Sequence, residues 1–573
     1  MRRRALGFGM GVPMVLALVG CQPTDSGEGG AGGESSPQAR RATQSLRPAV
    51  DVNTIVYNME DQPREIDPAT NTALGGGSLI QHVFEGLTFT GPGESVVPGV
   101  AERWDVSEDG LTYDFYLRND AKWSDGEPVT AHDFFYAWKR VVTPATAAQY
   151  ANLMYGIEGA EAFHTGETDD PSTLGFEAVT DHHFRVRLAR PISYFMQLTA
   201  FPVFVPVRQD VIEAHPNSWA NSAETYVGNG AFMLTGYERS HFFEMVPNPH
   251  YWNRDSVKIE RLRWLMITDP QSEYTAYRTN QLDVSYGIPL PDAPEIRRTM
   301  PEHMHVEPMV GIYYASFNCE RPPFDDVRVR RAFNLVIDRE TIANEVTEGL
   351  RKPAFTWVPE GIKDADGETE FCEVTGPMFP PLAEAREEAQ RLLAEAGYPN
   401  GEGFPATTYL YNTHDDHRRV AERLQVIWER DLGVKVELAN EEWQVFLSNR
   451  REGNFQIARG GWIGDYADPM TFLHIFMSDD GNNNAGYKSP EYDAMMNEAM
   501  NTADKARYFE LCHQAERLLM DNAAGAPIWY YSNYFLSNPA VEGLMITPTG
   551  DTLFHDAHWN HERLRAAGVE VGG

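Results

Sequence analysis

Several segments of the chain alternate apolar and polar side chains, which is the pattern of strands that are buried on one face. Between positions 111 and 117, for example, Tyr113 and Phe115 alternate with polar residues. The same period of two recurs at 184–188 and at 434–438. Because side chains at i and i+2 lie on one face of a strand, these three segments predict half-buried strands.

Other segments show the period of an α-helix. Apolar residues recur every three or four positions from 382 to 396, after two prolines and before Gly397, a residue typical of helix C-termini. A second helix is predicted around 420–427, and it leads by a short connection into the strand at Val434. This order of helix and strand indicates an α/β domain in the C-terminal half.

The first twenty residues predict a secretory signal peptide. Three arginines precede an apolar stretch, 5–20, that is too short and too rich in glycine for a membrane span. Small residues before Cys21 resemble the bacterial lipobox, so we expect 1–20 to be removed and Cys21 to be lipidated. Ordinary cleavage near a chance cysteine is the alternative. Residues 21–45 would then be a flexible tether, and no membrane-spanning segment follows residue 20.

Charge and cysteine usage narrow the class of protein. The formal net charge of −35 argues against nucleic acid as a partner, because phosphate binding needs a basic face. Cys319, Cys372 and Cys512 have no zinc-site spacing. Cys512 lies on an apolar helix face and is expected to be a core thiol. A Cys319–Cys372 disulfide is possible, and the sequence alone leaves it open.

Common enzyme motifs are missing from the sequence. There is no phosphate-binding loop, no HExxH and no GxSxG segment. The glycines at 75–77 predict a turn rather than a dinucleotide site. The histidine pairs 303/305 and 414/417 could each hold a metal, but neither has a third ligand nearby in sequence. These absences argue against an enzyme without excluding unusual chemistry, and no cofactor is expected.

A series of motifs then runs along most of the chain in a recognisable order. They are Val97–Trp104 (VPGVAERW), Leu117–Gly126 (LRNDAKWSDG), Pro128–Phe134 (PVTAHDF), Asn248–Trp252 (NPHYW), Phe324–Arg330 (FDDVRVR), Leu392–Tyr398 (LLAEAGY), Asn412, Gly461-Trp462 and Tyr487–Pro490 (YKSP). Together they resemble the oligopeptide-binding solute receptors of ATP-driven importers, solute-binding protein family 5, from about residue 50 to 540.

The resemblance implies an α/β fold of the type II periplasmic binding protein class (cluster C), with three domains in two lobes. Domain I would comprise 46–84, 210–310 and 533–573, domain II would be 85–209, and domain III, the second lobe, would be 311–532. Two chain crossings near Gly311 and Ser532 would form the hinge. The ligand would lie between the lobes.

The resemblance also implies a site for a peptide zwitterion. Asp465 would bind the ligand's ammonium, and Arg459, Arg450 and His417 would offer basic groups to its carboxylate. The ligand backbone would pair as an added β-strand with Gly461 and Ile463 and, on the other lobe, with Leu74. Aromatic residues would line the side-chain pockets: Tyr150, Tyr286, Tyr314, Trp443, Trp462 and Tyr531.

The sequence departs from the family pattern at four positions. Gly311 and Ile463 stand where close relatives carry a disulfide of the second lobe. Ser316 replaces a pocket glutamate, and Gly287 replaces an asparagine beside a cleft tyrosine. Specificity for particular ligand side chains is therefore not carried over from the family.

The functional expectation is a peptide-capturing lipoprotein of the periplasm or cell surface. It would bind as a monomer, stay attached to the membrane through its lipid anchor, and deliver ligand to a permease of two transmembrane and two ATPase subunits. The alternatives are a different cargo (murein tripeptide, a nickel chelate, haem or an oligosaccharide), a surface peptidase, or an anchored signalling or adhesion receptor.

Overall fold

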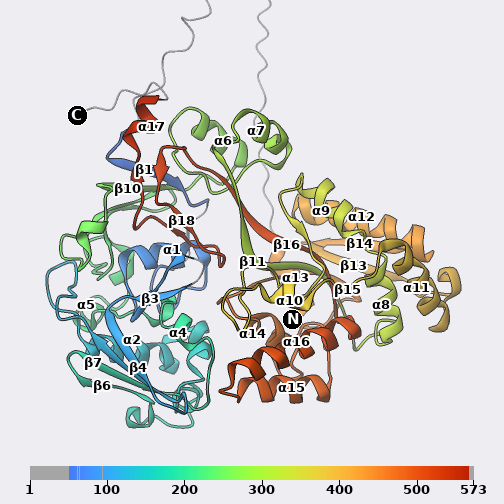
Figure 1. Ribbon diagram of the computed structural model, residues 1–573, viewed down its shortest axis with the longest axis horizontal. Helices are drawn as coiled ribbons and strands as arrows, with labels where there is room; N and C mark the ends of the chain where they lie inside the picture. Colours follow the sequence, from blue (N-terminus) through green and yellow to red (C-terminus); the bar gives the residue numbers. More distant parts are fainter. Residues whose placement is uncertain (1–50, 61, 64, 93–94, 567–573) are drawn as a thin grey trace, which may run out of the picture. The chain divides into compact units, whose positions relative to one another are not determined.

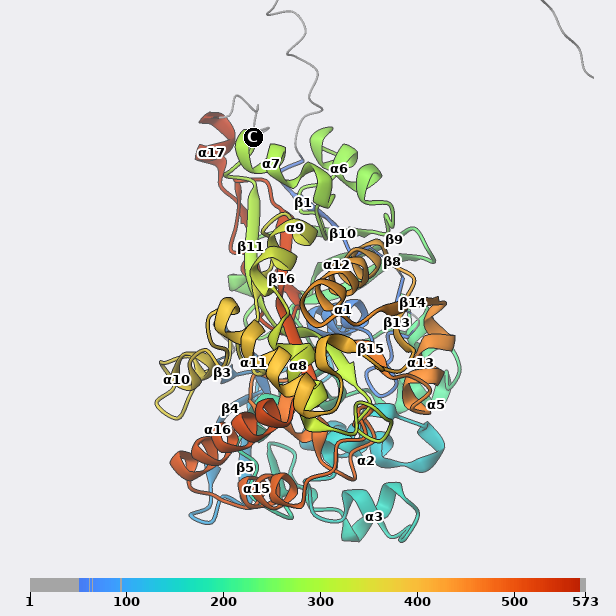
Figure 2. The same cartoon turned by 90° about the vertical axis from the view of Figure 1, so that its right-hand side faces the viewer.

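The computed structural model describes residues 51–60, 62–63, 65–92 and 95–566. The predicted signal peptide, Cys21 and the tether at 21–45 lie outside these residues. The described chain is a mixed α/β structure with three larger sheets and three two-stranded ones (Figure 1, Figure 2). This confirms the predicted α/β class.

Two four-stranded sheets are formed by the chain before residue 270. In the first, of order β1-β10-β9-β8, β1 is parallel to β10; the second, of order β4-β5-β7-β6, is antiparallel. Their strands are β1 (Thr54–Asn58), β4 (Ala101–Val106), β5 (Thr112–Leu117), β6 (Phe176–Thr180), β7 (His183–Arg187), β8 (Phe232–Glu238), β9 (Phe242–Pro247) and β10 (Arg261–Leu265). In β5 Tyr113 and Phe115 are buried and their neighbours are not, and Phe184 and Val186 are buried in β7, so both alternating patterns are confirmed.

The largest sheet has six strands in the order β12-β16-β11-β15-β13-β14. Its two longest strands, β11 and β16, pair antiparallel along most of their length (Figure 1). The strands are β11 (Met304–Phe317), β12 (Lys352–Pro353), β13 (Thr407–Asn412), β14 (Val436–Glu441), β15 (Ile457–Ile463) and β16 (Gly525–Leu536). The two-stranded sheets pair β2 (Thr88–Thr90) with β3 (Val96–Pro98), β17 (Val541–Glu542) with β20 (His558–Trp559), and β18 (Met545–Ile546) with β19 (Thr552–Leu553).

The two helices predicted in the C-terminal half are present. They are α11 (Leu382–Glu395), which is followed by Gly397 at a φ of +100°, and α12 (Asp415–Leu432), which ends at Gly433 at a φ of +70°. Glycine fits these positions because a positive φ strains residues that carry a Cβ. The apolar faces of both helices pack into a core beside β13 and β14.

The remaining helices cover the sheets, and some of the segments that connect them reach the site. Figure 2 shows α15 and α16 side by side, and their mutual contacts agree. The helices are α1 (Leu74–Val83), α2 (Ala131–Val142), α3 (Ala160–His164), α4 (Phe195–Leu198), α5 (Gln209–Ala214), α6 (Pro270–Arg278), α7 (Ala293–Thr299), α8 (Val327–Leu335), α9 (Arg339–Thr347), α10 (Phe371–Thr375), α13 (Trp443–Arg451), α14 (Met470–Leu473), α15 (Pro490–Met500), α16 (Lys505–Asn522) and α17 (His561–Ala566).

One residue of β11 connects two loops that matter for the site. The register between β11 and β16 shifts between Pro308 and Ile312, and Val310 lies at this shift. Its N–H donates to the carbonyl oxygen of Pro548 at 2.7 Å, and its own carbonyl accepts from the N–H of Gly464 at 2.8 Å. The loop after β15 and the turn at 547–551 are thereby fastened to the same point.

The described cysteines are all free thiols. The possible Cys319–Cys372 disulfide is not formed, and Cys512 is fully buried on α16 as predicted. Within the described ranges, no helix is both long and apolar enough to cross a membrane, and no group of three or more His, Cys, Asp or Glu is placed to hold a metal ion. The predicted domain boundaries and hinge positions stay predictions.

Candidate functional site

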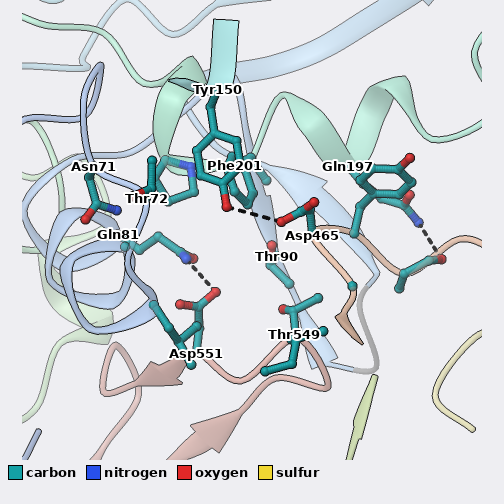
Figure 3. Close-up of a pocket in the computed structure, with 18 of the residues that line it drawn as sticks. Asn71, Thr72, Gln81, Thr90, Tyr150, Gln197, Phe201, Asp465, Thr549 and Asp551 are labelled. Atoms are coloured by element: carbon teal, nitrogen blue, oxygen red, sulfur yellow. Dashed lines mark hydrogen bonds between the residues drawn. The ribbon is translucent and has the colours of Figure 1, made fainter. Parts of the chain in front are cut away.

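A cavity of about 330 Å³ lies among segments that are far apart in the sequence (Figure 3). None of its described lining residues is Lys, Arg or His, whereas two, Asp465 and Asp551, are carboxylates. The lining residues are Asn71, Thr72, Ala73, Leu74, Gly77, Gln81, Thr90, Val96, Tyr150, Gln197, Ala200, Phe201, Pro202, Ile463, Gly464, Asp465, Tyr466, Ala467, Thr549 and Asp551. Four residues expected from the resemblance, Leu74, Tyr150, Ile463 and Asp465, therefore meet at one cavity.

The predicted ammonium-binding carboxylate, Asp465, is held by a tyrosine from the other half of the chain. The hydroxyl of Tyr150 donates to Oδ1 of Asp465 at 3.2 Å (Figure 3). Tyr150 is itself fixed edge-on against Phe201, with ring centroids 5.4 Å apart. Burial raises the pKa of Asp465, and the hydrogen bond from Tyr150 offsets part of that rise. A cation that entered the cavity would stabilise the charged form of this carboxylate.

Gly464, the residue before Asp465, lies so close to Val310 and Thr471 that only glycine fits there. A Cβ on Gly464 would lie 2.9 Å from Cγ1 of Val310 and 3.1 Å from Cγ2 of Thr471. These gaps are shorter than ordinary van der Waals contacts, so a side chain here would push the loop away from β11. Gly464 therefore fixes the position at which Asp465 leaves the end of β15.

Further contacts join the loop after Asp465 to the segment at 193–197. The rings of Tyr194 and Tyr466 stack with centroids 4.1 Å apart. Oγ of Ser193 donates to Oδ2 of Asp468 at 3.1 Å. Together with the Tyr150–Asp465 bond, these contacts close one side of the cavity.

One edge of β15 is open over much of its length. The strand pairs with β11 from Ile457 to Ile463, but its other edge pairs with β13 only at Ile457 and Ala458. From Arg459 onward, that second edge has no strand partner within the part of the chain that the structure describes. An open edge presents N–H and C=O groups to any added strand.

The phase of the ladder tells which backbone groups face this open edge. The bond from the Gly464 N–H to Val310 marks a hydrogen-bonded pair of β11 and β15, and such pairs alternate along an antiparallel ladder. Gly461 and Ile463 occupy the intervening positions. Their N–H and C=O groups therefore point away from β11, toward the open edge, as backbone pairing with a ligand would need.

Two arginines flank this edge from opposite faces of the sheet. Nη2 of Arg459 donates to the hydroxyl of Tyr531, and Nη2 of Arg450 donates to that of Tyr314, both at 3.0 Å. Arg459 also lies 5.2 Å from the ring centroid of Tyr313, and the neighbours Tyr313 and Tyr314 face opposite sides of β11. The Nε atoms of both arginines are buried without a partner, and neither forms an ion pair with a carboxylate of the described residues.

The third predicted basic group, His417, is neutral. Burial is the main cause that lowers its pKa, to about 2, and the positive charge of Arg459 is the next. Nδ1 of His417 lies 3.3 Å from the hydroxyl of Tyr313. At neutral pH this side chain can offer a ligand carboxylate a hydrogen bond, but no charge.

The other predicted aromatic residues lie away from the cavity. Trp462 faces the side of β15 opposite to Gly461; it packs against the core, and its Nε1 donates to Oγ1 of Thr471 at 3.3 Å. Tyr286 and Trp443 are 44% and 43% exposed and do not line the cavity. Trp462 does not line this cavity, because side chains alternate along a strand; its role in a pocket for ligand side chains stays a prediction.

The cavity also contains residues that sequence reasoning missed. Asp551 follows Gly550 in a short turn, and Gln81 lies on the second turn of α1. Nothing in the sequence distinguishes these two from ordinary turn and helix residues. Gly311 and Ile463, in contrast, are direct partners across β11 and β15, which is where a cross-strand disulfide would require them to be.

The fold and the site together define a type II periplasmic binding protein, with a ligand cavity beside an open strand edge. The comparisons agree. The profile of the bacterial extracellular solute-binding proteins, family 5, matches residues 95–484. The dipeptide-binding protein DppE of Bacillus subtilis is 32% identical over 560 residues, covering 97% of this chain and 98% of that protein. The periplasmic oligopeptide-binding protein OppA of Escherichia coli is 36% identical over 497 residues, covering 86% and 89%.

Solved structures give the same result. Haemophilus influenzae OppA in complex with the peptide RPPGFSPFR has a TM-score of 0.73 and 32% identity, covering 89% of this chain and 99% of that one. The Escherichia coli murein tripeptide binding protein MppA has a TM-score of 0.74 and 31% identity, covering 89% and 99%. The chain belongs to family 5 of the bacterial extracellular solute-binding proteins.

Proposed function

We propose that this protein captures short peptides and delivers them to an ATP-driven import permease. The observation that carries the proposal is the placement of opposite charges on one strand. Asp465 follows the end of β15, and Arg459 lies six positions earlier on its open edge. At roughly 3.3 Å per residue this separation is about 20 Å along the strand. The arginine side chains can reach back along the strand, so the distance between the opposite charges suits an extended peptide of a few residues.

Each common part of a peptide has a matching group in this arrangement. Its ammonium would pair with Asp465, and its backbone would add to the open edge at Gly461 and Ile463. Its carboxylate would be taken by Arg459 or Arg450, depending on ligand length, with His417 as a neutral donor. Backbone bonds carry no side-chain information, so this mode of binding tolerates many sequences.

Transport would depend on lobe closure rather than on bond chemistry. The ligand would bridge Asp465 on the second lobe and Leu74 on the first, so the closed state would be favoured by contacts that the open state lacks. The hinge would lie near Gly311 and Ser532, between domains with the boundaries given above. The body would work as a monomer outside the cytoplasmic membrane, anchored through a lipid on Cys21.

The proposal is tested by calorimetric titration of trialanine. The unmodified protein should bind trialanine and lose at least about tenfold in affinity when the peptide is N-acetylated, since removing one partner of a buried charge pair costs about 2–5 kcal/mol. Asp465→Asn should bind free trialanine with a similarly reduced affinity. Acetylation of the peptide should reduce the affinity of this variant no further. Asp283→Asn is the matched control, because Asp283 is also a buried carboxylate but lies outside the cavity.

The alternative functions and cargoes predict different results in the same experiment. Equal affinity for free and acetylated trialanine would contradict the assignment of Asp465. If neither peptide binds, the cargo is another solute, such as a chelate or an oligosaccharide. Cleavage products in the titration cell would instead support the peptidase alternative.

A further inference from the structure

A second carboxylate, Asp551, shares the cavity with Asp465. Its Oδ1 accepts from Oγ of Ser78 at 2.8 Å. Its Oδ2 accepts from Nε2 of Gln81 at 2.7 Å, as Figure 3 shows. Both donors are neutral side chains of α1. A carboxylate has about four acceptor sites, so further acceptor positions remain on the side of Asp551 that lines the cavity.

The turn that carries Asp551 is tightly constrained. The N–H of Asp551 donates to Oγ1 of Thr547 at 2.9 Å, and the N–H of Thr547 donates to the carbonyl of Asp551 at 2.8 Å. Between them, Gly550 adopts a φ of +101°, which favours glycine. Val310 bonds to both this turn and the loop of Asp465, so in this structure the two carboxylates line the same cavity.

The cavity has two carboxylates, so a single ligand ammonium would neutralise only one of them. Asp465 and Asp551 are both carboxylates, no lysine, arginine or histidine of the described chain lines the cavity, and Asp551 has no ion-pair partner among the described residues. One ligand ammonium on Asp465 would leave Asp551 uncompensated. Burial raises the pKa of Asp551, and the hydrogen bonds from Gln81 and Ser78 only partly oppose it.

A purely structural role for Asp551 explains less. Asparagine could also link the turn to Ser78 and Gln81, without the free-energy penalty of an enclosed negative charge. A carboxylate is the better choice only if a positive charge arrives. In an extended ligand the side chains alternate in direction, so the residue that carries the ammonium at Asp465 is the one whose side chain can share this cavity.

We propose that Asp551 selects peptides whose first residue has a basic side chain, lysine or arginine, by binding that second positive charge. This inference rests on the proposed function and deepens it. It places the preference for basic residues at Asp551, a position distinct from Ser316, where the glutamate of relatives is missing. The ligand class is therefore a peptide with two positive charges at its leading end.

The test compares three tripeptides in calorimetric titrations: Lys-Ala-Ala, Nε-acetyl-lysine-Ala-Ala and norleucine-Ala-Ala. All three keep the free α-ammonium, and only the first has a second charge. The unmodified protein should bind the lysine peptide at least about tenfold more tightly than either neutral one, which is about 1.4 kcal/mol. In Asp551→Asn this ratio should fall to about one, whereas in the control Asp283→Asn it should stay as in the unmodified protein.

Each outcome decides the question. A ratio near one in the unmodified protein, with all three peptides bound, overturns the inference and leaves the proposed function standing. A ratio of ten or more that persists in Asp551→Asn overturns the role of Asp551. Failure of all three peptides to bind refutes the proposed function, and the inference with it. If Asp551→Asn does not fold, Asp551→Ser provides the same comparison.

Discussion

Replacing Arg459 by methionine should abolish tight peptide binding without weakening the fold. Arg459 is partly buried, and among the described residues its Nε has no partner and its cation contacts the Tyr531 hydroxyl and the Tyr313 ring. Enclosing an unpaired ion costs several kcal/mol. The hydrogen bond returns about 1.5–3 kcal/mol and the cation–π contact about 0.5–2 kcal/mol. The net contribution of this arginine to stability is therefore close to zero or slightly negative.

A structural arginine provides the matched control. Arg339 is fully enclosed, and its guanidinium donates to the backbone oxygens of Pro527, Ile337 and Asn334 and to the Asn334 side chain. Arg339→Met would leave these buried acceptors unpaired at about 1–3 kcal/mol each. We expect this variant to lose at least about 3 kcal/mol of stability, a fall in Tm of roughly 5 °C or more.

Differential scanning fluorimetry and titration with trialanine separate the two effects. The ligand-free Tm of Arg459→Met should equal or exceed that of the unmodified protein, while its affinity for trialanine falls at least about thirtyfold, as for truncation of a buried charge pair. The reasoning would be refuted if Arg459→Met lowered the ligand-free Tm as much as Arg339→Met, because Arg459 would then be a structural residue.

Three further predictions follow from the site. Since the pKa of His417 is about 2 in the fold and about 6.5 when unfolded, stability should fall as pH drops below about 6.5, by up to about 1.4 kcal/mol per pH unit; urea titrations of His417→Gln should lack this component. Gly461→Val should reduce trialanine affinity at least about tenfold, because a Cβ there lies 2.9 Å from the Tyr531 hydroxyl, whereas Gly481→Ala, which meets nothing within 4 Å, should not change it. Tyr194→Ala removes a ring stack worth about 0.5–1.5 kcal/mol, and stopped-flow measurements should show faster ligand release.

The local structure could be predicted from the sequence wherever one face of an element is buried. Tyr113 and Phe115 reveal β5 because alternation is a direct record of burial, and Gly397 marks the end of α11 because the turn there needs a positive φ. The pairing of β1 with β10 joins residues about two hundred positions apart. No local pattern encodes that pairing, so it required the structure.

The site, too, contains residues that could be predicted from the sequence and residues that could not. Asp465 and Arg459 were found because the resemblance assigns roles to their positions beside Gly461-Trp462, and the structure places both on or beside β15. Asp551 has no such motif, since it is one aspartate in a turn, and its importance arises only from the packing of that turn against α1. Trp462 was assigned to a side-chain pocket through the resemblance, and strand alternation turns its ring to the face of β15 opposite to Gly461.

Main-chain pairing rather than a disulfide joins β11 to β15 beside the site. Gly311 and Ile463 are cross-strand partners at a non-hydrogen-bonded pair, where side chains on neighbouring strands come closest. A disulfide there would join β11 to β15, but the ladder between these strands is continuous without it. Val310, next to Gly311, binds the loop of Asp465 on one side and the turn of Asp551 on the other. In this structure both carboxylates are thus held through main-chain bonds to a single residue, and these bonds do not depend on the side chains at positions 311 and 463.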